Sequence, residues 1–166
     1  GLCALRHIRS GCTTLHHNGF DEDGKAGADR ALRSVKTYLA TGIRLAYSPS
    51  IRDLNKLALD DAAFWKTLPP DLQEWSKPLV ELDRKAAQDE YFALFDDLYR
   101  RFNDADTRIL LSAAWAHGAT EAYLRRMRET ADRLGGVQIH IHTLQTPVQK
   151  AYGLAALRVG FAIGHE

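Results

Sequence analysis

Two histidines near the C-terminal end of this 166-residue sequence have the spacing that metal chemistry uses. Apolar and polar residues alternate over 137–142, which is the period of a short β-strand. The alternation places His140 and His142 on one face of that strand. Thr146 and Pro147 follow as a helix start, so the pair precedes a βα junction, where α/β proteins keep their chemistry. The pair is a candidate set of metal ligands, with an ordinary core or surface position as the alternative.

The segment 140–152 reads His-Ile-His-Thr-Leu-Gln-Thr-Pro-Val-Gln-Lys-Ala-Tyr. It resembles the fifth-strand segment of metal-dependent amidohydrolases, in the branch of guanine, cytosine and S-adenosylhomocysteine deaminases and triazine hydrolases. There the segment usually reads His-x-His-Leu-x-Glu-Thr, with its second His as metal ligand and its Glu as proton shuttle. The resemblance implies that His142 is a metal ligand and that Gln145 stands at the position of the Glu. An amide cannot carry a proton, so Gln145 can only orient water or bind substrate.

Four apolar or β-branched runs are predicted as strands, with helical patterns between them. They lie near residues 12–16, 43–48, 108–113 and 137–142. Parallel neighbours need crossover connections, so the pattern predicts parallel βα units, adjacent in chain order with helices outside. Composition leaves a flavodoxin-like sandwich and half of a (β/α)8 barrel equally open. The resemblance, to which the Gly-x-Thr-Thr at 11–14 adds, favours a partial TIM barrel of about strands two to five.

Local signals refine this α/β prediction. Residues 2–9 have helical composition, and His17-Asn18-Gly19 is expected to form a turn. Segment 51–87 is predicted as a helical insertion, broken at Pro69-Pro70 and at Pro78. Thr120 is expected to be the N-cap of a following helix.

The whole chain, 1–166, is expected to form a single domain, because its length allows one core. The resemblance covers about residues 2–154 and leaves 155–166 as an unassigned tail. The family's first-strand His-x-His, sixth-strand His and eighth-strand Asp have no counterparts here. The sequence therefore resembles the central fragment of a longer amidohydrolase.

Further pocket-lining candidates are the polar and aromatic residues expected at strand ends, together with the first histidine of the pair. They are His16, His17, Asn18, Trp115, His117 and His140. One of His16 and His17 is expected to point into the barrel mouth. Trp115 and His117 are interpreted as a pair that could sandwich a flat heteroaromatic ring, against the alternative of a core indole and a solvated imidazole.

Charge and cysteine content exclude several classes of partner. The formal net charge of +1 argues against nucleic acid, and the apolar runs are too short to span a bilayer. Cys3 and Cys12 form no Cys-x-x-Cys motif, which indicates a reducing compartment, so a cytoplasmic location is expected. The two unpaired edges of four parallel strands predict a homo-oligomer or a partner that supplies the remainder of the barrel.

The resemblance implies hydrolysis of a carbon–nitrogen or carbon–halogen bond in a small aminated heterocycle. One divalent metal, zinc or iron, would activate the water in the full-length parent. His142 alone does not hold zinc tightly, since structural zinc takes four ligands, so the fragment by itself is expected to be inactive and could lack the metal. The alternative is a catalytically inactive α/β interaction or binding module, either flavodoxin-like or a degenerate barrel.

Overall fold

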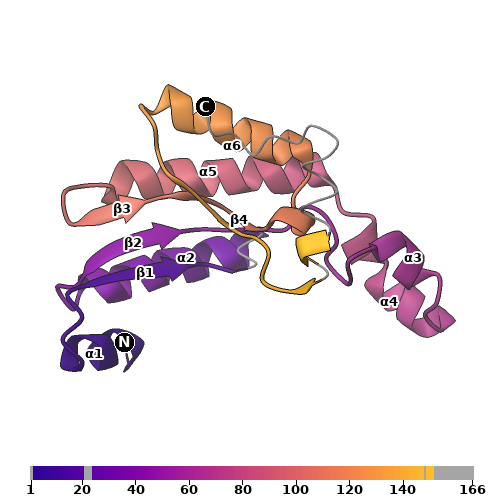
Figure 1. The fold of residues 1–166 in the computed structure, drawn as a ribbon, viewed down its shortest axis with the longest axis horizontal. Helices are drawn as coiled ribbons and strands as arrows, with labels where there is room; N and C mark the ends of the chain where they lie inside the picture. Colours follow the sequence, from indigo (N-terminus) through magenta and orange to yellow (C-terminus); the bar gives the residue numbers. More distant parts are fainter. Residues whose placement is uncertain (1, 21–23, 148, 152–166) are drawn as a thin grey trace.

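The computed structural model describes residues 2–20, 24–147 and 149–151, and the tail 155–166 lies outside these ranges. Strands and helices alternate along the chain (Figure 1). The elements are α1 (Leu2–Arg9), β1 (Thr14–Asn18), α2 (Gly24–Leu39), β2 (Arg44–Ser48), α3 (Asp61–Trp65), α4 (Pro70–Val80), α5 (Arg84–Phe102), β3 (Thr107–Ile109), β4 (Leu111–Trp115), the 3-10 turn η1 (Ala116–Gly118), α6 (Glu121–Arg133) and β5 (Ile139–His142).

Every strand pairing in the described residues is parallel, as predicted. β1 pairs with β2, and β2 pairs with β3. β4 pairs with β5 in a second sheet. The predicted order along the sheet is therefore confirmed, and so is the α/β class with its crossover helices.

The predicted strand 108–113 is divided in two at Leu110. Upstream of the break β3 pairs with β2, and downstream of it β4 pairs with β5. The backbone N–H of Leu110 still donates to the carbonyl of Tyr47 at 2.8 Å, and an isolated parallel bridge joins Ile51 to Ala113. The two sheets are thus continuous, and β3 and β4 occupy one strand position between β2 and β5.

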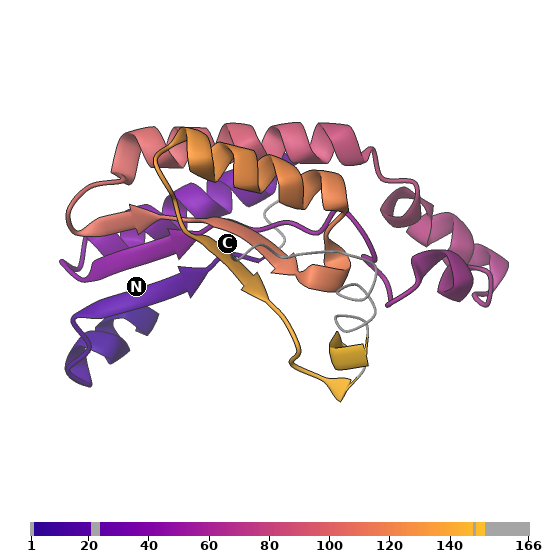
Figure 2. The same cartoon turned by 45° about the horizontal axis from the view of Figure 1, so that its top comes forward.

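The sheet is strongly curved. Three strand spacings of about 4.8 Å would put β1 and β5 about 14 Å apart if the sheet were flat. Yet the ring centroids of His16 on β1 and His140 on β5 are 4.6 Å apart. Side chains on one face can meet over that span only if the face is concave. The strands therefore form an open arc, with β1 and β5 at its two borders (Figure 2).

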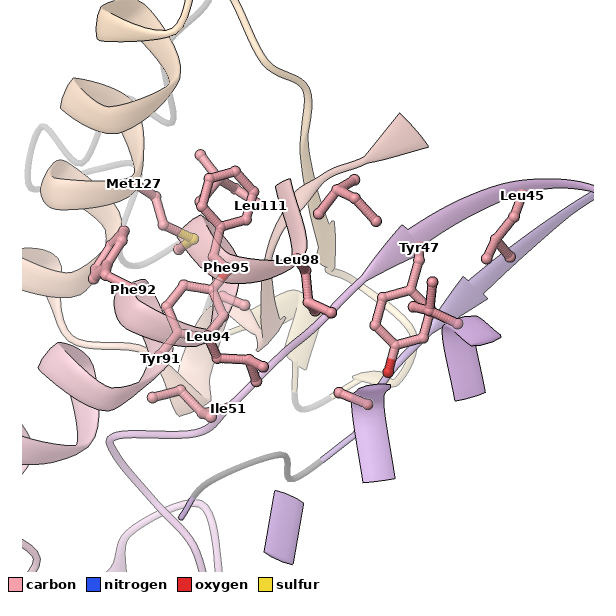
Figure 3. Close-up of a cluster of buried hydrophobic side chains, with 14 of the residues drawn as sticks. Leu45, Tyr47, Ile51, Tyr91, Phe92, Leu94, Phe95, Leu98, Leu111 and Met127 are labelled. Atoms are coloured by element: carbon pink, nitrogen blue, oxygen red, sulfur yellow. The ribbon is translucent and has the colours of Figure 1, made fainter. Parts of the chain in front are cut away.

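Helices α2, α5 and α6 cover the convex face of this arc. Leu45, Tyr47 and Ile109 point to that face and are at most 1% exposed. Figure 3 shows Tyr47 and the side chains of α5, including Phe95, within one apolar cluster. The concave face carries no helix among the described residues. This one-sided arrangement agrees with a partial barrel and contradicts a doubly wound, flavodoxin-like sandwich.

The tyrosines of α5 and α6 fasten these helices to β4. Tyr91 accepts a hydrogen bond from the backbone N–H of Ser112 at 2.7 Å through its hydroxyl. The hydroxyl of Tyr123 donates to the carbonyl of Ser112 at 3.0 Å. The backbone N–H and the backbone carbonyl of Ser112 therefore each have a hydrogen-bond partner, as buried polar groups require.

Two local predictions are wrong. The turn expected at 17–19 does not begin there, because β1 continues to Asn18, which pairs with Ser48 of β2. Pro78 does not break the insertion, since it lies inside α4. The other predictions hold: residues 2–9 are helical, the insertion carries α3 and α4, and Thr120 caps α6 by accepting from the N–H of Tyr123. None of the described helices is long and apolar enough to span a membrane.

Candidate functional site

Three imidazoles meet on the concave face, from β1 and β5. Nε2 of His140 and Nε2 of His142 are 3.1 Å apart and share a hydrogen bond. Their ring centroids are 4.8 Å apart and the rings are nearly perpendicular, at 86°. The ring of His16 contacts that of His140 edge to face. We call His16, His140 and His142 the histidine cluster.

The strand alternation explains why β5 presents its histidines here. Ile139 and Ile141 point the other way and pack against the apolar core, which fixes the phase of the strand. His142 pairs with Trp115 at the end of β4. His142 therefore lies at the end of its strand, beside the end of the strand that carries Trp115.

A hydrogen-bonded network continues from the cluster across three strands. Nε2 of His16 lies 2.9 Å from the hydroxyl of Ser48, which itself donates to Oδ1 of Asn18 at 3.0 Å. The hydroxyl of Ser112 donates to the same oxygen at 3.1 Å. Because the Ser48 proton is committed to Asn18, the Ser48 oxygen accepts from His16, which places the imidazole proton on Nε2.

Burial and neighbouring imidazoles favour the neutral rings of His16 and His140. Partial burial lowers the pKa of His16, and the nearby imidazole of His142 lowers it further. Partial burial likewise lowers the pKa of His140, with His16 and His142 adding to the effect. Neutral imidazole is the form that binds metal ions, so His140 is electrostatically suited to that role.

The geometry fits part of a metal site. Two nitrogens bound to one tetrahedral zinc at 2.0–2.1 Å lie about 3.3 Å apart, close to the spacing of the His140 and His142 nitrogens. His16 cannot join through Nε2 while that atom donates to Ser48. Across residues 2–20, 24–147 and 149–151, no group of three or more His, Cys, Asp or Glu side chains could hold a metal ion. A catalytic zinc takes three protein ligands, so the described residues supply only a pair.

A second group of side chains lies where β1, β2 and β4 end. The indole of Trp115 meets Phe20 edge to face at 5.0 Å and stacks on His117 at 5.7 Å and 20°. The guanidinium of Arg52 lies 5.5 Å from the ring centre of Phe20 and 5.2 Å from that of Trp115. We call these four residues the aromatic cluster.

The proposed sandwich of a ring between Trp115 and His117 does not fit the structure. A third ring between them needs two contacts of about 3.5 Å, or about 7 Å between the outer rings. Their centroids are only 5.7 Å apart, because the two rings already stack on one another. A flat ligand would have to use the outer faces of this group. Partial burial lowers the pKa of His117, and the charge of Arg52 lowers it further.

Gln145 lies next to the aromatic cluster and is exposed. Its side-chain Oε1 accepts a hydrogen bond from Nε1 of Trp115 at 3.2 Å, and its backbone N–H donates to Oε1 of Gln149 at 2.9 Å. The N–H of Lys150 donates to the carbonyl of Thr146 at 2.9 Å, so a helical turn begins here, as the sequence predicts. Tyr152, the last residue of the motif, lies outside the described residues.

His17 lies apart from both clusters. It points to the convex face, where its ring stacks on Tyr47 at 5.3 Å and Nδ1 lies 2.9 Å from the hydroxyl of Tyr38 on α2. Of the adjacent pair, His16 is therefore the residue on the concave side. This outcome agrees with the expectation that one of the two points into the barrel mouth.

Sequence reasoning missed Arg52, Phe20 and Ser112. Ser112 could have been predicted, because it lies opposite His140 in the pairing of the two adjacent predicted strands and points to the same face. Phe20 and Arg52 follow the ends of β1 and β2, where parallel strands bring loops together, but their meeting with Trp115 requires the curvature of the sheet.

A buried carboxylate anchors the loop that carries Arg52. Asp53 is 1% exposed. Its side chain accepts from the backbone N–H of Thr120 at 2.8 Å, from the hydroxyl of Thr120 at 2.5 Å and from Nε2 of Gln88 at 2.7 Å. The network ties the loop after β2 to the start of α6 and to α5. The backbone N–H of Asp53 also donates to the carbonyl of Gly118 at 3.1 Å, so the loop that carries Arg52 is held against the segment that follows His117.

Comparison with known proteins places this fold. No model of a known protein family matches the sequence, and no curated protein matches it. A solved structure of a triazine hydrolase variant superposes with a TM-score of 0.64 at 16% sequence identity. The match covers 94% of this chain and 30% of that chain, so this chain spans about a third of that protein. The fold is therefore that of part of a triazine hydrolase, a class within the branch that segment 140–152 resembles.

Proposed function

We propose that this chain forms the central strands of a metal-dependent hydrolase that acts on aminated heterocycles. The observation that carries the proposal is the His140–His142 pair, which lies on the concave face at the end of a parallel strand. It occurs in a fold that follows part of a triazine hydrolase variant. The carboxyl ends of barrel strands are where such enzymes place their chemistry.

In this proposal His142 is a metal ligand, as the sequence resemblance implies, and His140 supplies a second nitrogen beside it, since the two Nε2 atoms lie 3.1 Å apart. Zinc or iron bound there would acidify a water molecule and so supply the nucleophile. The remaining ligands would come from outside the described residues. The exposed free thiols of Cys3 and Cys12 are consistent with a reducing compartment, and we propose the cytoplasm.

The aromatic cluster is the proposed contact for the heterocycle. Phe20, which is 44% exposed, offers an apolar ring face beside Trp115, and Arg52 carries N–H groups of the kind that bind ring nitrogens. Asn18 and His117 lie at the ends of the same strands. A small, flat, nitrogen-rich substrate matches this combination of ring faces and hydrogen-bond donors.

Gln145 restricts the reaction. An amide cannot pass a proton from water to a leaving group. Held by Trp115, it can bind the substrate or orient water. The proposed reaction is therefore one whose leaving group needs little protonation, such as displacement of halide from a ring carbon, or one in which another acid assists loss of an amine.

The test is an assay of the zinc-loaded full-length parent with halogenated and aminated triazines, pyrimidines and purines, in which halide and ammonia are measured. We expect the Gln145→Glu variant to release ammonia about 10²-fold faster than the wild type, the lower end of what general acid–base catalysis contributes. Gln138→Glu, an exposed change just before β5, is the matched control. If the wild type releases ammonia as fast as the Gln145→Glu variant, with zinc bound to both, the assignment of Gln145 is overturned.

A metal-free binding module is the second candidate. It is favoured by the absence of a three-ligand group from the described residues and by the amide at position 145. Failure of the chain to bind zinc at the His140–His142 pair would support this candidate over the hydrolase.

A further inference from the structure

Two helices expose apolar stripes that the rest of the described structure leaves uncovered. On α1, Leu2 is 78%, Leu5 51% and Ile8 40% exposed. On α4, Leu72 is 45% and Trp75 73% exposed. Exposed apolar side chains gathered on one face mark interaction surfaces more often than scattered ones do.

The charges beside the two stripes have opposite signs. Helix α1 has no acidic residue, and Arg6 and Arg9 are exposed along its stripe. On α4, Asp71 and Glu74 are exposed and lie within about 100° of Trp75 around the helix, given 3.6 residues per turn. A basic-edged apolar stripe and an acidic-edged apolar stripe on the same molecule are complementary.

The most exposed apolar side chain of α4 is aromatic. Trp75 is 73% exposed, and no other aromatic residue lies on this helix. A tryptophan that becomes buried against a partner is a common energetic centre of an interface.

We propose that α1 of one copy docks on α4 of a second copy, with Leu72 and Trp75 against the apolar stripe of α1 and with Arg6 and Arg9 facing Asp71 and Glu74. The two helices lie at opposite ends of the molecule (Figures 1 and 2), so they cannot cover one another within one chain. The contact joins different surfaces of the two copies, and it therefore builds either an antiparallel pair with two such contacts or a longer head-to-tail assembly.

Sedimentation velocity over a concentration series tests the contact. One variant, Arg6→Glu with Arg9→Glu, makes both stripes acidic-edged, and a second, Asp71→Lys with Glu74→Lys, makes both basic-edged. Each alone should associate about tenfold more weakly than wild type, because two rim ion pairs become repulsive. Mixed together the two variants should associate again, since each then meets its complement.

Two further variants keep the test decisive. Arg6→Lys with Arg9→Lys retains the charges and should associate like wild type, and Trp75→Ala should weaken association with its charges intact. Circular dichroism establishes that each variant is folded. A chain that stays monomeric at every concentration, or a mixture that associates no better than its components, would overturn the proposal.

Discussion

The two faces of the same strands are built on different principles. On the convex face, Leu45, Tyr47 and Ile109 are at most 1% exposed and pack against helices. On the concave face, the partly buried ring of His16 begins a hydrogen-bonded network that reaches Ser48 and Asn18. One face supplies the apolar burial that holds the fold together, and the other carries side chains that could do chemistry. Substitutions on the convex face should therefore lower stability, and substitutions on the concave face should weaken ligand binding.

The largest loss of stability is expected from truncation of a core side chain on the convex face. Phe95 of α5 is fully buried, so Phe95→Ala should lower the free energy of unfolding by about 3–5 kcal/mol, measured by urea denaturation. His140→Ala on the concave face should lower it by less than about 1 kcal/mol. Similar losses for the two variants would show that the faces do not divide these tasks.

The second largest loss of stability is expected when the buried carboxylate of Asp53 is removed. Asp53→Ala leaves the N–H of Thr120 and the amide of Gln88 without their charged acceptor, at a cost of about 3 kcal/mol in the same assay. Asp132→Ala is the matched control, because it removes only an exposed i,i+4 ion pair with Arg128, worth about 0.5 kcal/mol or less. If Asp53→Ala matched that control, the network would not hold the loop.

The smallest effect is the acid sensitivity of the histidine cluster. Burial and neighbouring imidazoles lower the pKa of His16 and His140 below the value of 6.5 expected in the unfolded chain. Above that value neither state holds the proton. As the pH falls through 6.5 the unfolded state takes up protons first, so the free energy of unfolding decreases until the pH passes the folded pKa values.

NMR titration of the imidazole signals checks the lowered pKa values of His16 and His140 directly. The midpoints of His16 and His140 should lie lower in the folded chain than in the urea-unfolded chain, and His16→Gln should reduce the loss of stability in acid. Midpoints raised by folding would mean that the cluster favours protonated rings, which argues against metal binding.

The sequence predicted the strands well where their own side chains decide the structure. The alternation of 137–142 places His140 and His142 on one face because Ile139 and Ile141 need the core. It did not predict the break at Leu110, since an unbroken apolar run carries no local mark of where its partner strand changes. The length of β1 was missed for a similar reason, because the pairing of Asn18 with Ser48 overrides a sequence typical of turns.

The candidate site was predictable only within single strands. The pair on β5 needs one alternation pattern, whereas the contact of His16 with His140 depends on the curvature of the whole arc. Arg52, in the loop after β2, meets Phe20 after β1 and Trp115 at the end of β4, and no spacing in the sequence encodes that meeting. The stacking of Trp115 on His117, which rules out the sandwich, is equally a property of the packed loop.

The most direct test of the central claim is a zinc titration of the chain, followed through the imidazole resonances. We predict that zinc shifts the signals of His140 and His142 together, and that His142→Ala abolishes the shift. His17→Ala, on the opposite face, should leave it unchanged. Zinc that bound without moving those two signals, or that bound equally well to the His142→Ala variant, would contradict the assignment of His142 as a metal ligand.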